Sequence, residues 1–220
     1  IIAVLRLIEP PSKEQFSRSE NIKNMVHALR YISIESPILR SYILLSSVLG
    51  AATLLMAWFA QPYFQHAKIP LVYFGTLWAS LNIAVGIASW FAYRLSTKLS
   101  HYMLILLIIG SIVSGYWGTA FLPSYLGIAS IFILYIGRGL ATPILKNAIN
   151  AHTPSIMRAT VLSLRSFVIR FMFAVIAPFL GYITDTYTLN QAMLVSAILF
   201  SSISLLLFIV LQRLQAFEPN

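Results

Sequence analysis

The chain has 220 residues, of which 59% are hydrophobic and only 10% are charged, and its formal net charge is +9. Soluble domains carry roughly 25% charged residues, so this composition leaves too little polar surface for a water-soluble protein of this size. The excess of Lys and Arg fits the loops of a membrane protein better than a nucleic-acid-binding surface. We therefore expect the lipid bilayer to surround the protein, and we expect no nucleic-acid partner.

The sequence lacks the usual signs of a catalytic or cofactor site. It contains no cysteine, which excludes disulfides, thiolate metal sites and cysteine nucleophiles. Its histidines have no metal-ligand spacing, and it has no glycine-rich phosphate loop or Gly-x-Ser-x-Gly elbow. Only His101 or His152 could serve a membrane enzyme as a base, and ordinary loop histidines explain both. We expect no enzyme, no cofactor and no bound metal.

The first 37 residues precede the long apolar segments. Residues 1–8 are interpreted as the end of a preceding transmembrane helix whose beginning is missing, so the chain is interpreted as a fragment. Two prolines end that helix, and residues 9–37 are predicted to form a cytoplasmic connector. The connector has apolar residues at the spacing of an amphipathic helix; they are Ile22, Met25, Val26 and Leu29. We expect this helix either to lie along the membrane surface or to dock onto the ends of the bundle.

Six apolar segments follow, each long enough for the roughly 20 residues that a helix needs to cross a bilayer. The predicted spans are about 38–61, 70–93, 101–120, 124–146, 157–183 and 189–211. They give an all-α membrane domain over residues 38–213, followed by a cytoplasmic tail at 214–220. We expect Pro62 to stop the first span, Pro70 to begin the second, and Pro143 and Pro178 to bend the fourth and fifth.

Basic residues are divided unequally between the two sides of this domain. Lys68 stands alone on one side, and the other side holds Lys13, Arg18, Lys23, Arg30, Arg40, Arg94, Lys98, Lys146, Arg158 and Arg213. Because basic loops remain in the cytoplasm, we expect both ends there, in an integral protein of the cell membrane. At the opposite boundary we expect an aromatic belt; its members are Trp58, Tyr63, Tyr73, Tyr116, Trp117, Tyr125 and Tyr187.

Three arginines lie deep within the predicted spans, away from their ends. Arg138 and Arg170 lie roughly 18–21 Å from the span ends, near the bilayer midplane, where an unpaired charge costs several kcal/mol. Arg165 lies about one turn nearer to the cytoplasm, and snorkelling towards the headgroups is the simpler explanation for it. Because none of the six spans contains Asp or Glu, the partner charge comes either from a missing part of the protein or from an anionic substrate.

Polar neighbours of these arginines extend the candidate site. Tyr135 and Thr142 share a helix face with Arg138, and Ser163 and Ser166 share one with Arg170, because they are spaced three and four residues apart. Asn82 adds a polar group in the middle of the second span. The candidate cavity residues are therefore Asn82, Tyr135, Arg138, Thr142, Ser166 and Arg170. Close helix packing explains the remaining small residues, which are Ser46, Ser47, Gly50, Gly115 and Gly118.

Four segments carry a resemblance to a known family: the basic loop 92–100, residues 138–143 with Asn147 and Asn150, residues 158–164, and residues 181–185. In these segments, and over nearly its whole length, the chain resembles the C-terminal half of a major facilitator superfamily transporter. The resemblance implies two six-helix halves, each built from 3+3 inverted repeats, with this chain supplying helices seven to twelve. It also implies a central cavity lined by helices seven, eight, ten and eleven.

The leading hypothesis is therefore the C-terminal half of a secondary transporter that works by alternating access. Its expected partners are the missing N-terminal six-helix half and a small-molecule substrate, which is either anionic or paired with an acid of that half. Any coupling ion would bind through the missing half. The alternative is a self-contained six-span membrane scaffold or lipid-interacting subunit without transport activity.

Overall fold

The structure is a computed structural model that describes residues 30–32, 36–122 and 124–214. Within these ranges the chain is 91% helical and contains no strand. The expected helix end at residues 1–8, the amphipathic helix of the connector, Pro123 and most of the tail at 214–220 lie outside the described residues. The all-α class predicted for the membrane domain is confirmed.

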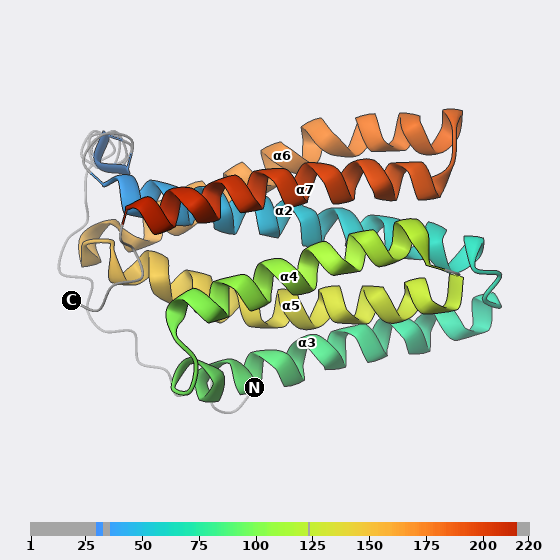
Figure 1. Cartoon of the computed structure of the whole chain (residues 1–220), viewed down its shortest axis with the longest axis horizontal. Helices are drawn as coiled ribbons and strands as arrows, with labels where there is room; N and C mark the ends of the chain where they lie inside the picture. The colour runs from blue at the N-terminus through green and yellow to red at the C-terminus, as the bar shows by residue number, and fades with distance from the viewer. Residues whose placement is uncertain (1–29, 33–35, 123, 215–220) are drawn as a thin grey trace, which may run out of the picture.

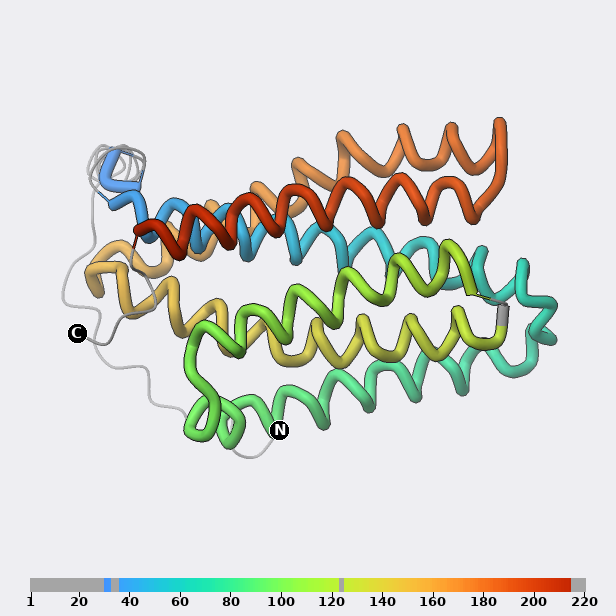
Figure 2. Tube along the Cα trace, viewed as in Figure 1, coloured from blue at the N-terminus to red at the C-terminus, as the bar shows by residue number. Residues whose placement is uncertain are grey.

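Six long helices run back and forth along the longest axis of the molecule (Figure 1). They are α2 (Pro37–His66), α3 (Phe74–Ser96), α4 (His101–Phe121), α5 (Ser124–Ala151), α6 (Arg158–Thr186) and α7 (Leu189–Arg213), with short 3₁₀ helices η3 (Leu71–Tyr73) and η4 (Ser155–Met157) leading into α3 and α6. All six long helices are long and apolar enough to cross a membrane, as predicted. The described chain enters α2 and leaves α7 at the same end of the bundle (Figure 2).

Hydroxyl side chains fix where several of these helices begin. The oxygens of Ser36, Ser100 and Thr188 accept hydrogen bonds from the backbone N–H three residues further on, at the starts of α2, α4 and α7. Such caps satisfy N–H groups that have no partner within the helix. The three helices therefore start within one residue of the predicted positions.

Three prolines lie at other positions relative to the helix ends than predicted. Pro62 lies inside α2, which continues for another turn to His66, so the expected stop at Pro62 is wrong. A proline removes only one backbone hydrogen bond, and membrane helices tolerate the loss where neighbouring groups compensate. Pro70 precedes η3 rather than opening α3, and α5 continues beyond Pro143 to Ala151.

The helices pack around a central pair. Helix α2 packs against α5, α6 and α7, while α5 packs against α2, α3 and α4, and α4 also packs against α7. Helices α3 and α6 lie at opposite edges of the bundle (Figure 1). Only 6% of the most apolar stretch of α6 is buried, against 67% in α2. The two edge helices therefore present most of their surface outward.

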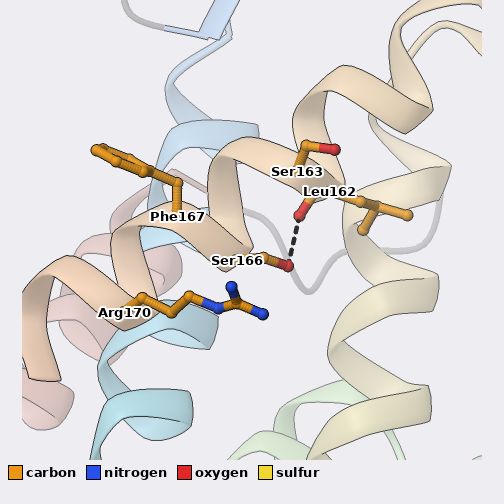
Figure 3. Close-up of a pocket in the computed structure, with 5 residues that line it drawn as sticks. All are labelled: Leu162, Ser163, Ser166, Phe167 and Arg170. Carbon is orange, nitrogen blue, oxygen red and sulfur yellow. Dashed lines mark hydrogen bonds between the residues drawn. The ribbon is translucent and has the colours of Figure 1, made fainter.

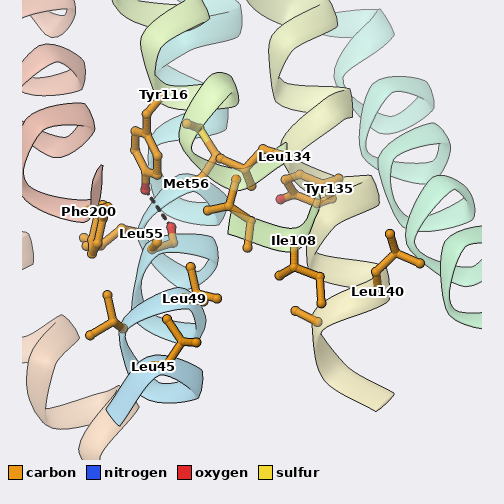
Figure 4. Packing of buried hydrophobic residues seen from close by; sticks show 14 of the residues in the cluster. Leu45, Leu49, Leu55, Met56, Ile108, Tyr116, Leu134, Tyr135, Leu140 and Phe200 are labelled. Carbon is orange, nitrogen blue, oxygen red and sulfur yellow. Dashed lines mark hydrogen bonds between the residues drawn. The ribbon is translucent and has the colours of Figure 1, made fainter. Parts of the chain in front are cut away.

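The core consists of Leu, Ile and aromatic side chains from all six helices, and Figure 4 shows part of it. The Tyr116 hydroxyl donates a 2.6 Å hydrogen bond to the carbonyl of Ala52, joining α4 to α2. Tyr116 and Tyr63 are each only 1% exposed, so placing them in the lipid-facing aromatic belt is wrong. Both tyrosines are core residues, because their rings are buried and the Tyr116 hydroxyl has a hydrogen-bond acceptor inside the bundle.

Glycines allow several of these helices to touch. A Cβ on Gly115 would lie 2.5 Å from the Cβ of Leu134, and one on Gly118 would overlap Ser130, so α4 and α5 meet there as expected from their small residues. Gly139 serves α3 and α5 in the same way, because a Cβ there would lie 2.6 Å from the carbonyl oxygen of Val85.

Candidate functional site

A cavity of about 210 Å³ lies where α2, α5 and α6 meet. Its polar lining consists of Ser46 and Thr53 from α2, Arg138 and Thr142 from α5, and Arg165 from α6. Leucines, an isoleucine and an alanine supply the rest of the wall; they are Leu49, Leu54, Ala141, Leu145 and Ile169. Two of the six predicted site residues, Arg138 and Thr142, thus line one cavity. Arg165, which is expected to extend towards the lipid headgroups, lines the same cavity instead.

Arg165 is half-buried and points to α2, where its Nε donates a hydrogen bond to the Ser46 hydroxyl. Ser46 is fully buried, so this contact fixes the guanidinium at the cavity wall. The interpretation of Ser46 as a residue that only allows close packing is therefore wrong. The sequence holds no local sign of the pair, because the two residues are 119 positions apart.

Arg138 rests on an aromatic ring. Its guanidinium carbon lies 5.5 Å from the ring centroid of Tyr135, which is within the range of a cation–π contact. Tyr135 is fully buried, and Trp78 of α3 meets it edge to face at 6.4 Å. Its hydroxyl has no hydrogen-bond partner of normal geometry among the described residues. Tyr135 therefore contacts Arg138 through its ring and is not part of the cavity lining.

Gly50 of α2 allows α6 to pack closely against α2 at one side of the cavity. A Cβ at this position would lie 2.6 Å from Cδ1 and 2.9 Å from Cγ1 of Ile169, well inside van der Waals contact. Both residues line the cavity. The expectation that Gly50 serves close helix approach agrees with this geometry, and the approach also defines one cavity wall.

Arg170 and Ser166 line a different hollow, of about 420 Å³, on the exposed side of α6. Figure 3 shows the Arg170 guanidinium and the Ser166 hydroxyl on the same side of the helix, with Phe167 pointing away from them. The Ser166 hydroxyl donates to the Leu162 carbonyl at 3.0 Å. Ser163 lines the same hollow, so the face predicted from the spacing is present, but it does not join the cavity of Arg138.

Asn82 lies apart from both hollows. Its side chain is exposed on α3, and its amide nitrogen donates to the Trp78 carbonyl of its own helix at 2.8 Å. Ser89, two turns further on, instead reaches α5, where its hydroxyl donates to the Gly139 carbonyl at 2.8 Å. Asn82 is therefore brought together with none of the other candidates inside the described part of the chain.

No carboxylate among the described residues pairs with the three intramembrane arginines. Asp185, the one acidic residue within the six helices, is adjacent to the last residue of α6, about 22 Å along the helix from Arg170 at 1.5 Å per residue. The cavity therefore contains two cationic side chains and no fixed counter-charge from these ranges.

Two histidines that are far apart in the sequence meet at the end of the bundle. The ring of the buried Tyr42 lies 5.7 Å from that of His101 and 5.3 Å from that of His152. His152 also contacts the Ala148 carbonyl through Nδ1 at 2.8 Å. These contacts join the ends of α2, α4 and α5.

A comparison with protein-family models and with curated proteins finds no match for this chain.

Proposed function

We propose that the chain is one six-helix half of a secondary transporter of the major facilitator type, which moves a small solute by alternating access. The observation that carries the proposal is the arginine-lined cavity at the junction of α2, α5 and α6. Charged side chains within membrane helices are costly and typically line substrate or ion pathways. Arg138 is 14 residues from the start and 13 from the end of α5, which corresponds to mid-membrane depth.

The helix packing supports an inverted repeat. In such a repeat α2, α3 and α4 correspond to α5, α6 and α7. The contact between α2 and α6 then corresponds to that between α5 and α3, and the contact between α2 and α7 corresponds to that between α5 and α4. All four contacts are present. Since each repeat has three helices, the second crosses the membrane in the opposite direction to the first. This is the 3+3 arrangement typical of the halves of such transporters, with substrate sites near the repeat interface.

The exposed edge helices support the expectation of a second six-helix half. Arg170 lies on the outward side of α6 near the middle of the helix, where direct contact with lipid would be unfavourable. A partner half or a water-filled passage against this face removes that penalty. In this proposal the N-terminal half of the transporter covers α3 and α6, and Asn82, Ser166 and Arg170 face the passage between the halves.

The orientation and location of the half follow from its basic residues. One end of the bundle holds the start of α2 and the end of α7. The basic residues near the helix ends gather on that side; they are Arg40, Arg94, Lys98, Lys146 and Arg158. The positive-inside rule assigns that end to the cytoplasm. The proposal therefore has both ends of the half in the cytoplasm, in the cell membrane.

Alternating access can be tested before the solute is known, because this chain has no native cysteine. In the full-length protein, with any cysteine outside this chain first replaced by serine, we would place a single reporter cysteine by Thr142→Cys and add a membrane-impermeant thiol reagent to right-side-out and to inside-out vesicles. Alternating access predicts labelling from both sides. Leu205→Cys on the exposed face of α7 is the matched control, since lipid should protect it from the reagent on either side.

A scaffold or lipid-interacting subunit predicts a different result. Without a passage, Thr142→Cys would be labelled from one side only or from neither side. That outcome, with normal abundance in the membrane, would reject the transporter proposal and leave the self-contained six-span protein as the better explanation.

A further inference from the structure

The contents of the cavity between α2, α5 and α6 indicate what it binds. We propose that this cavity is the binding site of a compact anion, a solute bearing a carboxylate or phosphate group, which forms ion pairs with Arg138 and Arg165. The inference rests on the proposed function, since it names the class of solute for the same half-transporter. It adds Arg165, with Ser46 as its positioning residue, to the binding group.

The first argument concerns charge. Arg138 and Arg165 come from different helices and line one cavity, and no carboxylate of the described residues pairs with either of them. Like charges in a poorly solvated space repel more strongly than in water. An anion between the two guanidinium groups converts that repulsion into two attractive interactions, so the cavity favours a negative ligand over a neutral or positive one.

The second argument concerns hydrogen-bond donors. The hydroxyl protons of Thr53 and Thr142 go to the carbonyls of Gly50, at 3.0 Å, and of Arg138, at 3.3 Å. Arg165 uses Nε on Ser46, which leaves its two terminal nitrogens as donors. Guanidinium groups match the oxygens of carboxylates and phosphates, often with two parallel hydrogen bonds. The strong donors that remain in the cavity are therefore those suited to an oxyanion.

The third argument concerns size. The cavity measures about 210 Å³, whereas pockets for drug-sized ligands measure about 300–1,000 Å³. Its other walls include Leu49, Leu54 and Ile169, which offer no hydrogen bonds. A short organic acid or a phosphate group fits this volume and lining, while an extended sugar or a bulky drug does not.

The test is equilibrium binding to the purified full-length protein in lipid nanodiscs, so it does not depend on transport. The thermal unfolding midpoint would be followed against acetate, lactate and inorganic phosphate at constant ionic strength, with acetamide and lactamide as neutral counterparts. We expect a saturable rise of the midpoint with at least one anion and none with the amides, because a ligand that binds only the folded state stabilises it. Carboxylates and phosphate are tested separately, so the preferred headgroup is identified.

The variants assign the effect to the cavity. Arg138→Gln and Arg165→Gln should each weaken anion binding tenfold or more, as expected for the loss of a charge-assisted hydrogen bond. Arg94→Gln is the matched control, because Arg94 lies on the rings of Trp90 and Phe91 at the end of α3, away from the cavity. If Arg165→Gln does not fold, Arg165→Lys keeps the charge but not the two-pronged geometry and should weaken binding three- to tenfold.

The proposal is overturned if no anion gives a saturable response, if the amides stabilise the protein equally, or if neither arginine variant changes the affinity. Failure of the proposed function would look different. In that case anions would still bind in an arginine-dependent way, while Thr142→Cys would remain inaccessible from one or both sides of the membrane.

Discussion

Arg165 on α6 donates a hydrogen bond through Nε to the hydroxyl of Ser46 on α2. The bond is made between a half-buried cation and a fully buried hydroxyl, and it lies at the wall of the cavity that also holds Arg138. The least buried helix of the bundle is thereby fixed to the most buried one. With α6 in this rotation, Arg165 faces the cavity while Arg170 lines the separate hollow on the exposed side of the helix.

Replacing the acceptor should weaken the bundle. Ser46→Ala leaves the Nε of Arg165 without its partner, and we expect it to lower the free energy of unfolding by about 1–3 kcal/mol. Denaturant or thermal unfolding in mild detergent measures the change. Ser47→Ala is a close control, because the Ser47 hydroxyl is equally buried but has no partner among the described residues. Its replacement should leave the stability unchanged or raise it; equal losses for both serines would contradict the assigned role of the Arg165–Ser46 bond.

Gly139 should tolerate no side chain. In Gly139→Ala the new Cβ would lie 2.6 Å from the Val85 carbonyl oxygen and 2.7 Å from the Ala88 Cβ, which forces α3 away from α5 and stretches the Ser89–Gly139 hydrogen bond. We expect a loss of about 1–3 kcal/mol, as for other overpacked cores. Gly86→Ala on α3 meets nothing within 4 Å and should be neutral or stabilising by up to about 1 kcal/mol. A Gly139 variant as stable as the Gly86 variant would show that the two helices are not in close contact there.

The ring of Tyr135 should matter more than its hydroxyl. Tyr135→Phe keeps the surface on which Arg138 rests and removes a buried hydroxyl that lies beside Arg138 without a hydrogen bond of normal geometry, so the stability should change by less than about 1 kcal/mol. Tyr135→Leu loses the cation–π contact, worth about 0.5–2 kcal/mol, and should lower both the unfolding midpoint and solute uptake. Comparing the two variants by thermal unfolding and by uptake into proteoliposomes separates the roles. Equal behaviour of Phe and Leu at this position would argue against support of Arg138 by the ring.

If the chain transports a solute as proposed, Arg170 should be needed for transport but not for folding of the six-helix bundle. Arg170 is exposed on the outward side of α6 and makes no ion pair with any described residue, so Arg170→Leu should leave the membrane abundance unchanged or raise it, because a charge is removed from the bilayer. We expect uptake to fall at least tenfold. Val175→Leu, at an exposed position of α6 outside this hollow, should keep wild-type uptake. Full transport by Arg170→Leu would indicate that this face of α6 contacts lipid headgroups or solvent and not the passage.

The spans were predictable because their signal is local. Runs of about 20 residues with little charge predict the existence and order of the six helices, and in the structure Ser100 and Thr188 cap the starts of α4 and α7. The stop at Pro62 failed because a proline's effect depends on whether neighbouring groups satisfy the freed carbonyl, and that depends on tertiary packing. Helix spacing also correctly placed Thr142 beside Arg138 and Ser166 beside Arg170.

The site itself was only partly predictable because it depends on how the helices are rotated against one another. Nothing in the local sequence distinguishes Ser46, which accepts a hydrogen bond from Arg165, from Ser47, which has no partner among the described residues. For the same reason Arg138 and Arg170, which lie at similar depth, were grouped together, although they line separate hollows. The meeting of His101 and His152 across Tyr42 is likewise a consequence of the packing of three helices.

The Arg165–Ser46 contact also bears on how the protein is made. Besides Arg158 at its first residue, helix α6 carries Arg165 and Arg170 in its interior, and an arginine near a helix centre costs about 2.5–3.5 kcal/mol when a helix enters the bilayer from the translocon. Helix α2 precedes α6 in the chain and is therefore synthesised and inserted first. When α6 emerges, a hydroxyl acceptor already stands in the membrane to receive Arg165, so the order of synthesis lowers the barrier to insertion of the most polar of the six helices.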